Sequence, residues 1–103
     1  QIIGPDLPAK DITTLKSVIS AKLNGQEVKI RFSKEGTDGV KIFSRRGNET
    51  EFQFLAISTQ SPYDDNRAKL ESSKPEQREY YVVLFDDVND VGIRSDVIRA
   101  TVP

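Results

Sequence analysis

Apolar and polar residues alternate along several short stretches of the chain. In residues 26–33, Val28, Ile30 and Phe32 alternate with charged side chains, which is typical of a half-buried β-strand. The same period of two predicts further strands at 18–23, 40–46, 51–58, 78–86 and 94–102, with one short strand near Tyr63. These seven short strands favour an all-β fold, an antiparallel seven-stranded β-sandwich.

The stretch 15–23 fits two structures. Leu15, Ile19 and Leu23 suit one face of a helix, but Ile19 and Leu23 also fit the alternation of a strand. The dipeptide Asn24-Gly25 follows directly and is a strong signal for a two-residue hairpin, in which both central residues have positive φ. We therefore predict a strand that forms a hairpin with residues 26–33.

A sandwich of this kind buries the inward-facing residues of both sheets in one core. The alternation predicts these core residues: Val28, Ile30, Phe32, Val40, Ile42, Tyr80, Val82, Leu84, Ile98, Ala100 and Val102. Any functional site must then lie on loops or on an outer sheet face.

Composition narrows the possible functions. The 103 residues are enough for one domain, with 36% apolar and 30% charged residues, as in globular proteins. The net charge of −1 does not suggest nucleic-acid binding, and no apolar run is long enough for a membrane helix. The chain has no Cys and no His, which excludes thiolate and imidazole chemistry. We expect no cofactor and no metal.

The first 14 residues differ from the rest. Residues 1–14 contain two prolines and a glycine, so we predict a linker that leads into a domain spanning residues 15–103. The chain contains no Met, and Gln1 is therefore not the initiator residue. We expect the chain to be a fragment of a longer protein, and the sequence leaves the compartment of that protein open.

The last two predicted strands resemble the end of a fibronectin type III domain. The residues that carry the resemblance are Tyr80, Val82, Leu84, Asn89, Gly92, Ser95 and Thr101. It implies one sheet of strands A, B and E and another of C′, C, F and G. It also implies that the hydroxyl of Tyr80, which follows Pro75, bonds back to the backbone. Phe32 stands near the position of the family's tryptophan, which is a departure from the pattern.

A narrower resemblance involves the segments DGVKIFSRRG, FLAISTQSPYDDNR and KPEQREY. They are similar to segments of a set of uncharacterised bacterial proteins, in which such a module follows an N-terminal helical region. The resemblance implies a C-terminal module of a bacterial protein and brings no known activity.

Three polar motifs allow a functional or a structural interpretation. The acidic turn 86–90 fails the pattern of an EF-hand calcium loop twice, so we predict a solvated turn with positive φ at Asn89 and Gly92. Asp64 and Asp65 are adjacent in a strand and should point to opposite faces, which does not suit a catalytic carboxylate pair. The glycosylation sequon at 48–50 is expected at a charged hairpin tip.

The alternation also predicts an apolar outer face. If Tyr80, Val82 and Leu84 point inward, their neighbours on the same strand point outward, next to an outward residue of the strand 40–46. This candidate interaction face consists of Phe43, Tyr81, Val83, Phe85 and Val97. On the predicted strand 51–58, an outward Gln53 would place Leu55 and Ile57 outside as well. A large exposed apolar patch usually marks an interface. Alternatively, the aliphatic stems of Lys41, Arg45 and Arg99 cover it, or Ile2, Ile3 and Leu7 fold back over it.

These observations favour a non-catalytic structural or protein-interaction module, a spacer or docking domain of a larger bacterial protein. Its expected partners are other domains of the same parent chain, and self-association is an alternative. A carbohydrate-binding module that stacks sugars on Phe43, Tyr63, Tyr81 and Phe85 is the second hypothesis. An enzyme would have to work without imidazole or thiol groups, so we expect none.

Overall fold

The computed structural model describes residues 13–103, and every regular element in this range is a β-strand. The strands are β1 (Ile19–Asn24), β2 (Glu27–Phe32), β3 (Gly39–Arg46), β4 (Gln53–Ser58), β5 (Tyr63–Asp65), β6 (Glu76–Asp86), β7 (Asn89–Val91) and β8 (Ile98–Val102). The prediction of an all-β chain is confirmed, and the region 15–23 forms a strand rather than a helix.

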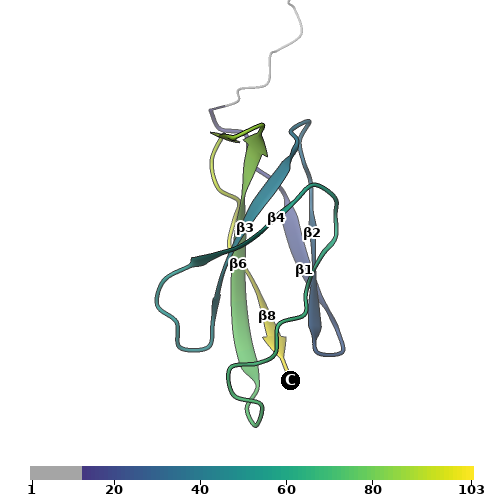
Figure 1. Ribbon diagram of the computed structural model, residues 1–103, viewed down its shortest axis with the longest axis vertical. Coiled ribbons are helices and arrows are strands. Elements are labelled where there is room, and N and C mark those ends of the chain that lie inside the picture. The colour runs from purple at the N-terminus through teal and green to yellow at the C-terminus, as the bar shows by residue number, and fades with distance from the viewer. Residues whose placement is uncertain (1–12) are drawn as a thin grey trace, which may run out of the picture.

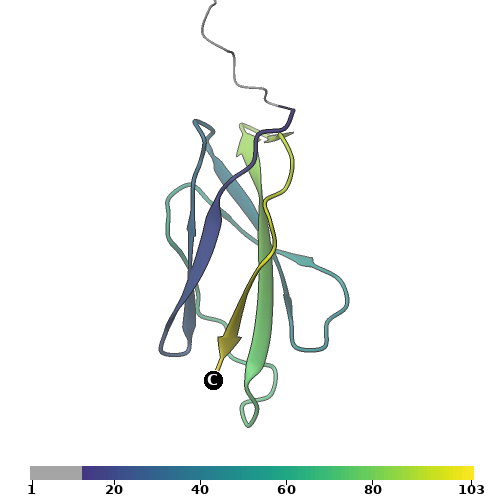
Figure 2. The same ribbon diagram turned by 180° about the vertical axis from the view of Figure 1, so that it is seen from behind.

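The strands form two antiparallel sheets (Figure 1). One sheet has three strands in the order β1-β2-β5. The other has five: β4, β3 and β6 lie next to one another in this order, and β7 and β8 share the far side of β6. Both β7 and β8 pair with β6, at opposite ends of this long strand. In the view from behind, β1 and β8 lie side by side where the two sheets meet (Figure 2). This arrangement is compatible with a β-sandwich.

Among residues 13–103 there are eight strands rather than seven, because residues 89–91 of the predicted turn also pair with β6 as β7, while the predicted strand 94–102 pairs regularly only in its second half. β7 ends at Val91 and is followed by Gly92, whose φ of 72° takes the chain out of the strand. Ser95 still contacts β6, since its N–H donates to the carbonyl of Val82 and its hydroxyl accepts the N–H of Val82. Regular pairing resumes at Ile98.

The core lies between the sheets and agrees with the predicted residues. Nine of them are buried: Val28, Ile30, Phe32, Val40, Ile42, Tyr80, Val82, Leu84 and Val102. Ile98 and Ala100 are partly buried and pack against them. Full burial of one such aliphatic side chain stabilises the fold by roughly 1.5–3 kcal/mol. The core thus supplies a rigid support for the outer faces.

The first hairpin forms as predicted, but its turn is shifted by one residue. Asn24 pairs with Glu27, so the turn residues are Gly25 and Gln26. Only Gly25 has a positive φ, at 65°, whereas the prediction placed positive φ at both Asn24 and Gly25. A glycine at the first central position is typical of a type II′ turn, which suits a right-twisted hairpin.

A β-bulge changes which residues of β4 face outward. Strict alternation predicted that Leu55 and Ile57 lie outside together with Gln53. The register shifts between Ile42 and Phe43, and Phe54 becomes the partner of Phe43. Phe54 and Ile57 are therefore exposed, while Leu55 packs against the core.

Gly39 allows a close approach of three segments at the start of β3. A Cβ atom at Gly39 would lie 2.5 Å from the carbonyl oxygen of Ser58 and 3.1 Å from the ring of Phe85. We expect Gly39→Ala to lower the free energy of unfolding by about 1–2 kcal/mol, because backbone as well as side chain must shift. Urea denaturation would measure this loss, with Ser20→Ala at an exposed strand position as the control. Equal stability of the two variants would contradict the close packing.

Of the predicted linker 1–14, only Thr13 and Thr14 belong to the described residues, so the linker itself lies outside them. Leu15 already packs against the core, and its carbonyl accepts the N–H of Ile93. Among residues 13–103, no helix is long and apolar enough to cross a membrane.

Candidate interaction surface

Four aromatic rings gather on the outer face of the five-stranded sheet. Phe43 on β3 pairs in register with Tyr81 on β6, and their rings stack with centroids 5.0 Å apart and planes 13° apart. Phe54 meets Phe43 edge-on at 5.9 Å, and Phe52 meets Tyr81 edge-on at 4.8 Å. We call these four residues the aromatic cluster. Offset and edge-to-face contacts of this kind stabilise aromatic pairs beyond their burial alone.

Two guanidinium groups cover part of the aromatic cluster. The Cζ atom of Arg45 lies 4.7 Å from the centre of the Phe52 ring, and that of Arg94 lies 5.0 Å from the centre of the Tyr81 ring. Such cation–π contacts contribute roughly 0.5–1 kcal/mol each at exposed sites. Of the five predicted face residues, Tyr81 is thus covered, but by the guanidinium group of Arg94 rather than by an aliphatic stem. The alternative cover by Ile2, Ile3 and Leu7 lies outside the described residues.

Ion pairs border the aromatic cluster on the same face. Glu79 on β6 accepts hydrogen bonds from Arg45 on β3 and from Arg99 on β8. These two hydrogen bonds lower the pKa of Glu79. Toward the other end of β3, Lys41 forms an ion pair with Asp90 at 2.6 Å. The face is thus an apolar centre between two sets of strand-bridging ion pairs.

Comparisons with protein-family models, curated proteins and solved structures found no match. The face is therefore interpreted from its own chemistry.

The five predicted face residues differ in exposure. Phe43, Tyr81 and Val83 are half-buried on neighbouring strands. Phe85 is 8% exposed because it stands opposite Gly39, where its ring occupies the space that a side chain would take. Val97 is 40% exposed, but it lies in the irregular segment before β8. Phe85 thus offers little surface for a partner.

Sequence reasoning missed the most exposed apolar residue of the face, Phe54, which is 57% exposed. It also missed Phe52, which precedes β4. Ile57, which is 55% exposed, was expected on the outside. The alternation along β4 assigned Phe54 to the opposite face because the sequence gives no sign of the bulge. The apolar surface that remains open is thus centred on β4 rather than on β6.

A second cluster of polar side chains lies between the sheets, and all of its members except the half-buried Arg67 are buried. Asp65 on β5 accepts two hydrogen bonds from Arg67, from Nε to Oδ1 and from Nη2 to Oδ2, each at 2.8 Å. The hydroxyl of Tyr80 donates to Oδ2 of Asp65 at 2.6 Å, and Nη1 of Arg78 lies 3.3 Å from the same oxygen. Arg78 also donates from Nε to Glu76 at 2.7 Å. We call Asp65, Arg67, Glu76, Arg78 and Tyr80 the ionic cluster.

The ionic cluster corrects the expected role of Tyr80. The resemblance to fibronectin type III domains implied a hydrogen bond from its hydroxyl to the backbone, but the acceptor is the side chain of Asp65 on the opposite sheet. The prediction that adjacent Asp64 and Asp65 point apart is borne out by their partners. Asp64 is exposed and pairs with Lys29 at 3.0 Å, whereas Asp65 is buried.

Burial and hydrogen bonding have opposite effects on the pKa of Asp65 in this cluster. Desolvation raises the pKa of Asp65, but hydrogen bonds from Arg67 and Tyr80 outweigh it and bring the pKa to about 2. Desolvation and the nearby Asp65 raise the pKa of Tyr80. The carboxylate and the phenol thus keep their ordinary charge states. Both are at most 1% exposed, so a substrate cannot reach them, and their role is to join the two sheets.

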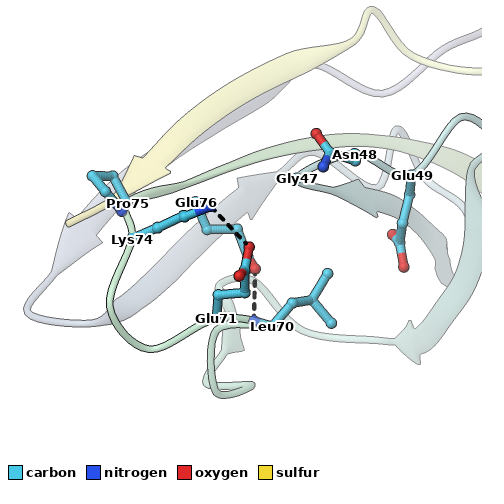
Figure 3. A pocket seen from close by; sticks show the side chains of 8 residues that line it. All are labelled: Gly47, Asn48, Glu49, Leu70, Glu71, Lys74, Pro75 and Glu76. Atoms are coloured by element: carbon cyan, nitrogen blue, oxygen red, sulfur yellow. Dashed lines mark hydrogen bonds and ion pairs between the residues drawn. The ribbon is translucent and has the colours of Figure 1, made fainter.

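An open groove of about 440 Å³ lies beside the ionic cluster (Figure 3). Its lining residues are Gly47, Asn48, Glu49, Leu70, Glu71, Lys74, Pro75 and Glu76. Glu76 uses Oε1 to accept the N–H of Leu70, which holds the polar loop before β6 against the strand. Asn48 of the sequon lies in the turn after β3, as expected from the sequence. The groove mixes charges of both signs and carries no convergent set of ligand-binding groups.

The acidic turn between β6 and β7 is a corner, as predicted, but its backbone differs from the prediction. Positive φ occurs at Asp87, at 55°, and at Gly92, rather than at Asn89. Asp86 accepts the N–H of Asp38, and the side chain of Asp38 accepts the N–H of Asp87. These carboxylates thus bind backbone groups. Within residues 13–103 no group of three potential ligands could hold a metal ion.

Proposed function

We propose that the chain is a non-catalytic protein-interaction module, a docking or spacer domain of a larger bacterial protein. The observation that carries the proposal is the outer face of the five-stranded sheet, where Phe54 of the aromatic cluster and Ile57 on the same strand are exposed. An exposed apolar centre with a charged rim is the usual composition of a protein interface.

We further propose that the fold is of the fibronectin type III kind. The strand orders support this assignment, since β1-β2-β5 corresponds to A-B-E and β4-β3-β6-β8 corresponds to C′-C-F-G. The division of the last strand into β7 and β8 is a local departure. The Tyr80–Asp65 bond in place of a backbone bond is another. This fold hosts many unrelated activities, so the functional proposal depends on the surface alone.

The chemistry of the chain supports a non-catalytic role. It has no Cys and no His, and Asp65 and Tyr80 are buried away from substrate. The exposed carboxylates Asp64 and Asp90 are each paired with a lysine. The accessible carboxylates are thus held in ion pairs, and the two buried groups, Asp65 and Tyr80, have pKa values shifted away from the neutral range that general acid–base catalysis favours.

The carbohydrate hypothesis receives less support from the ring geometry. A sugar needs open ring faces, but Phe43 and Tyr81 stack on each other and Arg94 lies over Tyr81. Phe85 is buried, and Tyr63 lies on the other sheet. We expect no saturable amide shifts when an oligosaccharide panel is added to millimolar concentration. Saturable shifts at the aromatic cluster would favour the carbohydrate hypothesis.

The docking proposal predicts binding to the remainder of the parent polypeptide. When this remainder is added to the isotope-labelled chain, we expect saturable amide shifts at Phe43, Tyr81 and Val83. Phe54→Ser should weaken the binding at least about tenfold, because a desolvated aromatic anchor is lost. Leu70→Ser is the matched control, since Leu70 is 55% exposed and lies in the groove rather than on this face. Shifts confined to the groove, or equal effects of both variants, would contradict the proposal.

A further inference from the structure

Charge is absent from one long stretch of an otherwise highly charged chain. Residues 52–63 form the longest uncharged run of the sequence, although 31 of the 103 residues (15 basic and 16 acidic) carry a charge. This run contains all of β4, Gln53–Ser58. Proteins usually place charges on exposed sheet edges, because an open row of backbone N–H and C=O groups can pair with another strand.

β4 is a sheet edge and differs from the other edge strands. Its only strand partner within residues 13–103 is β3, so its second side is not paired with a strand. Every other edge strand carries a charge: Lys22 on β1, Asp64 on β5, Asp90 on β7 and Arg99 on β8. β4 carries none, and its two outward residues are the most exposed large apolar groups of the face. Charged residues on an edge strand normally prevent such an apolar edge from pairing with another strand.

The sequence of β4 is complementary to itself in antiparallel register. Phe54 and Ile57 both face outward, since they pair with the outward Phe43 and Lys41 of β3. If two β4 strands pair about a two-fold axis between Leu55 and Ala56, Phe54 of each copy stands opposite Ile57 of the other, on the same face. An aromatic residue opposite a β-branched one is among the favourable cross-strand pairs, and no like charges oppose each other.

We propose that two copies of this chain associate through antiparallel pairing of their β4 strands, which joins the two five-stranded sheets into one continuous sheet. The inference rests on the proposed function, since it names the partner of the same face. The pairing leaves neither copy with an open β4 edge, so no third copy can add through this strand and the assembly is a dimer.

The dimer should be weak. A ladder of six residues per copy with two Phe–Ile contacts is smaller than a standard interface, and the bulge in β4 limits its length. We therefore expect a dissociation constant in the micromolar to millimolar range, typical of transient contacts. Such a contact gains strength where copies are held close together.

Sedimentation velocity of the chain from about 10 µM to about 1 mM tests the proposal. We expect a concentration-dependent shift from monomer to dimer, accompanied by amide broadening and slower hydrogen exchange in β4. Phe54→Lys and Ile57→Lys should each weaken dimerisation at least about tenfold, because each places a charge on the edge twice per dimer. Thermal melting of each variant checks that its fold persists.

Val18→Lys is the matched control. Val18 is also an exposed β-branched residue, 72% exposed, but it lies beside the edge of the three-stranded sheet. This variant should dimerise like the unaltered chain. A monomer at every concentration would overturn the inference, as would a dimer that survives Phe54→Lys and Ile57→Lys. If the monomer still binds the remainder of its parent polypeptide through the outer face, the docking function stands and only self-association fails.

Discussion

Replacing Asp65 with alanine should lower the free energy of unfolding by about 3–5 kcal/mol, the loss expected when one partner of a buried ion pair is removed. Arg78 is fully buried between two carboxylates, and the variant would remove one of them and leave Glu76 as the other. The hydroxyl of Tyr80 would lose its acceptor, and Arg67 would lose three hydrogen bonds, two from its guanidinium group and one from its backbone N–H. With a total stability of roughly 5–15 kcal/mol for such a domain, this loss is a large fraction.

The neighbouring aspartate provides the control for this prediction. Asp64→Ala removes an identical side chain one residue earlier, but its partner Lys29 is accessible to solvent. An exposed ion pair of this kind contributes about 0–1 kcal/mol. Urea denaturation of both variants, with the slope of the transition compared, measures the difference. A loss of less than about 1 kcal/mol for Asp65→Ala would mean that the ion pair with Glu76 alone balances the buried charge of Arg78.

The predicted core follows from alternation alone because every inward position between the sheets must be filled. Val28, Ile30 and Phe32 lie where a period of two places them, and so do Val82 and Leu84. A one-residue slip would expose the whole set, so pattern and register determine each other. This link between pattern and burial made the two-sheet arrangement predictable from the sequence.

The same alternation indicates only those members of the ionic cluster that lie on β6. The inward series of Tyr80, Val82 and Leu84, continued backward by two residues at a time, reaches Arg78 and Glu76. Alternation therefore signalled two buried charges at the start of β6, although the predicted strand began only at Arg78. Asp65, which contacts Arg78 and Tyr80, is separated from Tyr80 by 15 residues and lies on the other sheet. No local pattern predicts such a pairing.

The open surface differs from the predicted face for two local reasons. Phe85 is covered because Gly39 opposite it has no side chain, and such cross-strand contacts depend on the register between β3 and β6. Phe54 is exposed because of the bulge in β4, which alternation along one strand does not reveal. Both residues are apolar in the sequence, and only the pairing of strands decides which of them is open to a partner.

Lowering the pH should destabilise the fold by at least about 2 kcal/mol between pH 4 and pH 2, chiefly through Asp65. Its pKa falls from 3.8 to about 2 on folding. As the pH falls below about 4, the unfolded chain takes up a proton first, while Asp65 of the folded chain stays ionised. The stabilisation is therefore complete above pH 4 and is lost as the pH falls through about 2. The lowered pKa values of Glu76 and Glu79 add to the loss in the same direction.

A pH series of urea midpoints for three proteins tests this assignment. We expect the unaltered chain and Asp64→Asn to lose stability in parallel below pH 4, since Asp64 is exposed. Asp65→Asn should start from a lower stability at neutral pH and show a flatter profile, because the group whose pKa changes on folding is gone. The three curves should thus converge toward pH 2. If the curve of Asp65→Asn instead stays parallel to that of the unaltered chain, proton uptake by Asp65 does not cause the loss, and the ion pairs of Glu79 with Arg45 and Arg99 become the source to examine.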